Sequence, residues 1–191
     1  MNIKPSIELF RRHPGNPIIS VKDFSYPANS VFNAGATRAG DKTLLLMRVE
    51  DRRGISHLTV ARSKDGISEW GIDPRPTIMP SPDTHPEEIY GIEDPRITYI
   101  EEQDQWAILY TAYSEGGPMV SLATTADFQE FERHGPVLPP EDKDAALFPV
   151  RFGGRWAMIH RPVSTFPYTG AHIWISFSPD LKHWGDHRIQ I

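Results

Sequence analysis

The sequence predicts an all-β protein of the β-propeller type, and three observations lead to this prediction. Eighteen prolines and 14 glycines are spread along 191 residues, so few windows are long enough for a helix of ordinary length. Short runs rich in β-branched and aromatic residues lie between these breaks. An internal repeat groups the runs into units of similar design.

The apolar runs between the breaks are the predicted strands. Aromatic residues make up 10% of the chain, which is more than a disordered, proline-rich coil contains. We therefore expect strands at 43–49, 57–61, 97–100, 106–113, 119–123, 156–160 and 172–177.

Three units of the repeat share an opening and a closing element. Each opens with a tight polar turn followed by an apolar strand, which is typical of a hairpin; these elements lie at 40–48, 103–111 and 153–161. Each closes with a turn in which an Asp (Asp65, Asp127 or Asp180) precedes an aromatic residue by four or five positions. Because this Asp recurs in every unit, a turn-capping role explains it better than a ligand site does.

The repeat length of about 50–60 residues matches a four-stranded propeller blade. The approximate blades are 30–75, 90–135 and 145–188, within a single partial domain covering 1–191. A propeller closes with at least four blades. We therefore expect this chain to be a fragment of a longer protein; completion by another chain is the alternative.

Polar residues at the mouths of the inner strands are the candidate site residues, since these strands line the central channel. The inner strands are expected at 33–38, 93–98 and 147–151. Glu93 and Asp94 precede a proline, and on an extended segment they point to opposite sides, so at most one faces the channel. A carboxyl group that faces the channel can have a raised pKa and act as a general acid. The alternative is that this segment is a turn with a salt bridge to Arg96.

Basic residues form a second candidate group. Arg48 and Arg161 occupy equivalent positions in the first and third repeats, and Lys143 lies just before the third inner strand. Converging Arg and Lys side chains suit an oxyanion such as phosphate. Ordinary surface salt bridges are the alternative.

Composition and missing motifs exclude several classes of protein. The net charge of −5 argues against a nucleic-acid partner, and the chain has no cysteine for thiol chemistry, disulfides or zinc-thiolate sites. No histidine spacing predicts a metal site, and no nucleotide-binding or serine-hydrolase motif occurs. No apolar run is long enough to span a membrane and no signal peptide begins the chain, so we expect a cytoplasmic protein. The sequence leaves a homo-oligomer open.

Five motifs in order resemble the mannoside phosphorylases of glycoside hydrolase family 130. They are Asn-Ser-Val-Phe-Asn-Ala-Gly at 29–35, Arg-Val-Glu-Asp at 48–51, Gly-Ile-Glu-Asp-Pro-Arg at 91–96, Lys-Asp-Ala-Ala-Leu-Phe-Pro at 143–149 and His-Arg-Pro at 160–162. The resemblance covers about residues 16–184.

The resemblance implies a five-bladed propeller, of which about three blades are present, and inverting phosphorolysis of β-mannosides to α-mannose 1-phosphate. It implies that Asp94 is the proton donor, acting through a mannose hydroxyl, and that phosphate is both co-substrate and nucleophile, with no cofactor. Asn33 and Arg48 match mannose-binding residues, and Glu93 is a further substrate-binding candidate. Lys143 and Arg161 match phosphate ligands, although the first is often Arg in relatives.

Two other functions stay open. An inverting β-mannosidase needs a base to activate water, and the basic pair argues mildly against it. A non-catalytic carbohydrate-binding propeller could stack sugars on Trp106, Trp156 or Tyr113. The loops 85–90 and 164–169 are placed to contact an acceptor sugar, but linkage and acceptor are not fixed. Because relatives continue for two more blades, we expect this chain to be inactive alone.

Overall fold

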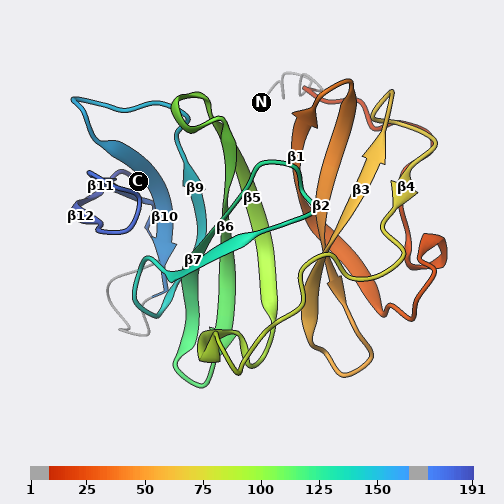
Figure 1. Cartoon of the computed structure of the whole chain (residues 1–191), viewed down its shortest axis with the longest axis horizontal. Helices are drawn as coiled ribbons and strands as arrows, with labels where there is room; N and C mark the ends of the chain where they lie inside the picture. The colour runs from red at the N-terminus through yellow and green to blue at the C-terminus, as the bar shows by residue number, and fades with distance from the viewer. Residues whose placement is uncertain (1–8, 164–171) are drawn as a thin grey trace, which may run out of the picture.

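A computed structural model describes residues 9–163 and 172–191 (Figure 1). These residues form three four-stranded antiparallel sheets. Their strands are β1 (Ser30–Ala39), β2 (Lys42–Glu50), β3 (Ser56–Ser63) and β4 (Gly71–Ile72); β5 (Ile92–Ile100), β6 (Gln105–Ser114), β7 (Gly117–Thr125) and β8 (Glu132–Pro136); and β9 (Asp142–Leu147), β10 (Trp156–Pro162), β11 (Trp174–Ser178) and β12 (Gly185–Ile189). The connections carry short 3-10 helices η1 (Val21–Asp23), η2 (Pro86–Glu88) and η3 (Glu101–Gln103).

The three sheets, named blades 1, 2 and 3 in chain order, stand side by side (Figure 1). The first strand of each blade is its inner strand: β1 contacts β5, and β5 contacts β9. Each blade then runs outward strand by strand in sequence order. This arrangement confirms the predicted all-β fold and its propeller-type blades. No helix within the described ranges is long and apolar enough to cross a membrane.

Apolar side chains hold the blades together. One cluster lies between blades 1 and 2 and includes Leu46, Ile108 and Phe128. A second lies between blades 2 and 3 and includes Trp156, which is 1% exposed. The outer face of blade 1 is covered by the segment before β1, through side chains such as Phe24. The middle strands of blade 2, β6 and β7, are buried along most of their length, so side chains on both of their faces are removed from water.

The closing turns of the repeat have the predicted capping structure. In each turn the Asp carboxylate accepts two backbone N–H hydrogen bonds, and a hydroxyl two residues earlier accepts another. The pairs are Ser63 with Asp65, Thr125 with Asp127, and Ser178 with Asp180. These Asp residues are therefore turn caps in all three units.

Each inner strand contains a β-bulge at the same place. The register shifts between Phe32 and Gly35 in β1, between Glu93 and Arg96 in β5, and between Lys143 and Ala146 in β9. The first bulged residues have positive φ angles: 46° for Asn33, 51° for Asp94 and 57° for Asp144. The bulges therefore bend the three inner strands alike and re-aim the side chains at these positions.

The prediction for the third inner strand was wrong. We expected it at 147–151, but β9 is Asp142–Leu147 and ends before Pro149. Pro149 has no N–H to continue a ladder, and Val150 is exposed. The polar start of β9 carries no apolar signal, and its carboxylates find partners on β10 instead. Lys143 consequently lies within the inner strand rather than before it.

A buried histidine fixes the covering segment to blade 1. The Tyr26 hydroxyl is hydrogen-bonded to His57 Nε2 at 3.2 Å and to Thr59 Oγ1 at 2.6 Å. His57 is 4% exposed, and burial lowers its pKa, although the charge of Asp51 opposes the shift. Burial lowers the pKa of His134 in blade 2 in the same way. Folding is therefore coupled to pH through both histidines.

We predict that the free energy of unfolding falls as the pH drops below about 6.5, the ordinary histidine pKa. In that range the unfolded chain takes up protons at His57 and His134, whereas the burial of His57 and the partial burial of His134 oppose protonation in the folded protein. Urea unfolding between about pH 8 and pH 5 measures this. His57→Gln should flatten part of the slope, and an equal slope in this variant would contradict the role of His57.

Gly35 is a point of close approach between blades 1 and 2. A Cβ there would lie 2.8 Å from Pro95 O and 2.9 Å from Ile97 Cγ1. We predict that Gly35→Ala lowers the free energy of unfolding by about 1–3 kcal/mol. Gly185→Ala is the control, because its Cβ would meet nothing within 4 Å. Equal urea midpoints for the two variants would show that β1 and β5 are not packed this closely.

Candidate active site

Asp94 is the centre of the candidate site, at the bulge of β5. Its side chain is 7% exposed. Oδ1 accepts a hydrogen bond from Asn33 Nδ2 at 3.0 Å and another from Arg48 Nη1 at 3.1 Å. Both donors come from blade 1, so the site is built across the boundary between two blades.

Arg48 is held on every side. Nη2 donates to Glu93 Oε1 at 2.8 Å, Nε donates to Ser56 Oγ at 2.9 Å, and the guanidinium lies 4.4 Å from the Phe32 ring centroid. Sequence reasoning did not select Ser56, since a serine that starts a strand carries no special signal. The arrangement fixes the guanidinium between two carboxylates.

The expectation that Glu93 and Asp94 point to opposite sides was wrong. Both bind Arg48, because the left-handed conformation of Asp94 interrupts the alternation of the strand. The alternative of a salt bridge from Glu93 to Arg96 was also wrong: Arg96 Nη1 donates to the carbonyl of Pro95. The two adjacent carboxylates thus share one cation from the neighbouring blade.

Glu93 lies where acidic and basic groups meet. Burial raises its pKa, and the positive charges of Arg48 and Lys143 oppose this shift. The charges of Asp94 and Glu50 act in the same direction as burial. The positive charge of Lys143 on blade 3 therefore acts on Glu93 of blade 2.

Lys143 and Arg161 are directly opposite each other on β9 and β10. Arg161 donates from Nε at 2.9 Å and from Nη2 at 2.5 Å to Asp144 Oδ2. Sequence reasoning did not select Asp144, although it directly follows Lys143. The feature it shares with Asn33 and Asp94, a positive φ at a bulge of the inner strand, exists only in the folded chain. The structure thus joins the predicted residues into two groups, one around Asp94 and one on blade 3.

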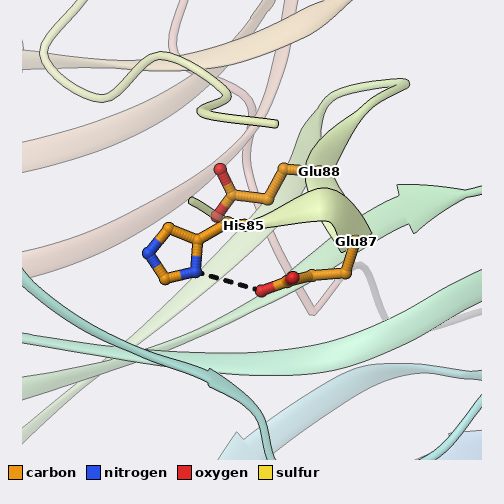
Figure 2. Close-up of side chains that lie close together, drawn as sticks. All are labelled: His85, Glu87 and Glu88. Atoms are coloured by element: carbon orange, nitrogen blue, oxygen red, sulfur yellow. Dashed lines mark hydrogen bonds and ion pairs between the residues drawn. The ribbon is translucent and has the colours of Figure 1, made fainter. Parts of the chain in front are cut away.

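One cluster among the described residues has metal-ligand side chains close together, and its geometry favours a structural role. It consists of His85, Glu87 and Glu88, and Figure 2 shows the 3.2 Å contact between His85 Nδ1 and Glu87 Oε1. Glu88 is fully buried, and it accepts hydrogen bonds from Tyr110 Oη, Arg133 Nη1 and Ser81 N. A guanidinium already neutralises this carboxylate, which anchors the loop to blade 2.

The aromatic residues proposed for sugar stacking are placed differently from one another. Trp156 is buried, and Trp106 packs against Phe128 at a centroid distance of 5.0 Å. Tyr113 is 41% exposed and lies 6.1 Å from the ring of Tyr90, in the loop 85–90. The second predicted acceptor loop, 164–169, lies outside the described residues.

The arrangement can support acid catalysis beside an anion. A buried carboxyl group with one oxygen fixed by two donors has its second oxygen available for proton transfer. Lys143 and Arg161 supply the positive charge and the donors that an oxyanion requires. When no anion is bound, the carboxylate of Asp144 balances part of this positive charge through its ion pair with Arg161.

Comparisons with known proteins identify the family of the chain. The family model of glycoside hydrolase family 130, described as beta-1,4-mannooligosaccharide phosphorylase, matches residues 5–191. The beta-1,2-mannobiose phosphorylase of Listeria innocua is 38% identical over 134 residues, covering 70% of this chain and 36% of its own. The beta-1,4-mannooligosaccharide phosphorylase of Ruminococcus albus is 32% identical over 184 residues, covering 93% and 53%.

A solved structure gives the same result for the fold. The beta-1,2-mannobiose phosphorylase from Listeria innocua, in complex with beta-1,2-mannobiose, matches with a TM-score of 0.83 and 28% identity over 94% of this chain and 65% of that chain. The chain spans about a third to three fifths of the length of these curated relatives. The family model covers nearly all of the sequence, so this chain belongs to glycoside hydrolase family 130.

Proposed function

We propose that the protein phosphorolyses β-mannosides with inversion, releasing α-mannose 1-phosphate and a shortened acceptor. The observation that carries the proposal is the buried Asp94, held by Asn33 and Arg48, next to Glu93, whose pKa is raised by burial and lowered in part by the charge of Lys143 in the basic pair Lys143 and Arg161. The names of the curated relatives, all mannoside phosphorylases, support the same substrate class. Because the chain spans only part of those relatives, the activity is proposed for the whole protein.

Asp94 supplies the proton in this proposal. Asn33 and Arg48 occupy Oδ1, which leaves Oδ2 to carry the proton. The proton passes through a hydroxyl of the bound mannose to the glycosidic oxygen as the bond from that oxygen to C1 breaks. Asn33, Arg48 and Glu93 present the donors and acceptors that hold the sugar ring.

Phosphate supplies the nucleophile. An oxygen of phosphate attacks C1 from the face opposite the leaving group, and a new C1–O–P linkage forms with inversion. No second catalytic carboxylate is required, in contrast to an ordinary inverting glycosidase. Lys143 and Arg161 bind the anion, and Arg161 turns from Asp144 toward it.

The linkage is the finer question within this proposal. One relative is named for β-1,2-mannobiose and another for β-1,4-mannooligosaccharides. Both mannobioses are therefore the substrates to test, on the 191-residue chain and on a form extended at its C-terminus. Tyr90 and Tyr113 are exposed rings close to the start of β5, since Tyr113 N donates to the Gly91 carbonyl, and they can contact the acceptor.

Asp94→Asn is predicted to lower the rate of mannose 1-phosphate release by at least about 10²-fold, because the amide cannot donate the proton. Calorimetry should show that the variant still binds mannobiose, since the amide oxygen can accept from Asn33 and Arg48. Asp41→Asn, in an exposed hairpin turn, is the control. An Asp94→Asn enzyme of normal rate would remove Asp94 from the mechanism.

Turnover is predicted to require phosphate, and the Michaelis constant for phosphate should rise about tenfold or more in Lys143→Met, since a charged hydrogen bond is lost. Lys42→Met, an exposed lysine of the β1–β2 hairpin, should leave this constant unchanged. Release of free mannose at equal rates with and without phosphate would instead identify a β-mannosidase.

A further inference from the structure

A chain of hydrogen bonds crosses blade 3, with one side chain from each of its four strands. Asp142 of β9 accepts from His160 Nδ1 at 2.6 Å. His160 Nε2, on β10, is hydrogen-bonded to Ser176 Oγ of β11 at 2.6 Å, and Ser176 Oγ is hydrogen-bonded to His187 Nδ1 of β12 at 2.6 Å. We name these four residues the blade 3 relay.

The relay is buried over most of its length. Asp142, His160 and Ser176 are 5%, 3% and 0% exposed, and only His187 reaches the surface. Asp142 Oδ1 has no hydrogen-bond partner in the part of the chain that the structure describes. A buried polar network that is incompletely satisfied destabilises a fold relative to an apolar core, so folding alone does not explain it.

The other blades show that the fold does not require polar residues at these positions. Asp142 lies two positions before the first bulged residue of blade 3, and its register equivalents are Val31 and Ile92. The residue facing the bulge of blade 3 is His160, and its equivalents in blades 1 and 2 are Met47 and Tyr110. Blade 3 therefore carries an acid and a base where blade 1 carries two apolar side chains.

The position of the relay connects it to the proposed anion site. Asp142 directly precedes Lys143, and His160 directly precedes Arg161. Successive side chains of a strand point to opposite faces, so restraining Asp142 and His160 on one face restrains the two basic residues on the other. The bulge between them interrupts the backbone ladder, which makes a side-chain restraint effective there.

We propose that the blade 3 relay is a positioning network that holds Lys143 and Arg161 in the geometry that binds phosphate. This inference rests on the proposed function, since it deepens the anion half of that site. The relay acts through the strands β9 and β10 and does not touch the substrate.

The order Asp142, His160, Ser176 matches the hydrogen-bond order of a serine-hydrolase triad, but its surroundings do not fit acyl transfer. Ser176 is fully buried in a middle strand, and its hydroxyl is shared with His187. A substrate carbonyl cannot reach this oxygen. A positioning role requires no such access.

The test replaces Asp142 and His160 of the relay with the residue types of their blade 1 equivalents, Val31 and Met47, in the double variant Asp142→Val and His160→Met. Removing both polar partners should leave the free energy of unfolding unchanged or raise it. Calorimetric binding of inorganic phosphate should weaken roughly tenfold or more, because the basic residues lose their restraint. Ser176→Ala, a smaller change within the relay, should weaken phosphate binding in the same direction.

The control is a hydroxyl–histidine hydrogen bond in blade 2, between Thr124 Oγ1 and His134 Nε2 at 2.9 Å. Thr124→Val with His134→Met should leave phosphate affinity unchanged. In the form that turns over, the relay variants should raise the Michaelis constant for phosphate while mannobiose affinity stays constant.

The outcomes separate the two proposals. If the wild-type chain binds phosphate and both relay variants bind it equally well, the positioning role is overturned while the anion site stands. If the double variant does not fold, Ser176→Ala decides the question by the same comparison. A wild-type chain that binds no phosphate overturns the anion site and the relay assignment together.

Discussion

The left-handed residue at the bulge of each inner strand is the local constraint on which the candidate site depends. Such a conformation costs about 1–3 kcal/mol for an ordinary residue and less for Asn or Asp. The three positions hold Asn33, Asp94 and Asp144, so the residue types suit the backbone. Because each bulge also re-aims its side chain, one backbone device presents three polar groups at corresponding points of three blades.

The acidic half of the site exists only when blades 1 and 2 are packed together. Arg48 of blade 1 binds Glu93 and Asp94 of blade 2, and all three side chains are largely removed from water. A buried carboxylate without its cation is strongly disfavoured. The apolar cluster between the blades and the close approach at Gly35 therefore place the charges, and the ion pairs in turn join blade 1 to blade 2.

Blade 3 differs from the other blades in the positions of its polar residues. The chain has a net charge of −5, yet two basic residues are register partners on β9 and β10. Asp144 balances one of them, and the blade 3 relay occupies interior positions that are apolar in blade 1. The overall acidity thus conceals a local basic site, and the unusual interior lies directly behind it.

The sequence by itself determined the strands with apolar patterns, the capped turns, the blade repeat and the candidate residues, because these depend on neighbours along the chain. The prediction of the third inner strand was wrong, because the polar residues that start β9 have no apolar pattern. Tertiary structure alone decided that Glu93 and Asp94 share Arg48, that Asp144 pairs with Arg161, and that a relay crosses blade 3. The physical reason is distance along the chain: Asn33 and Asp94 are 61 residues apart, and only the packing of blades brings such partners within a hydrogen bond.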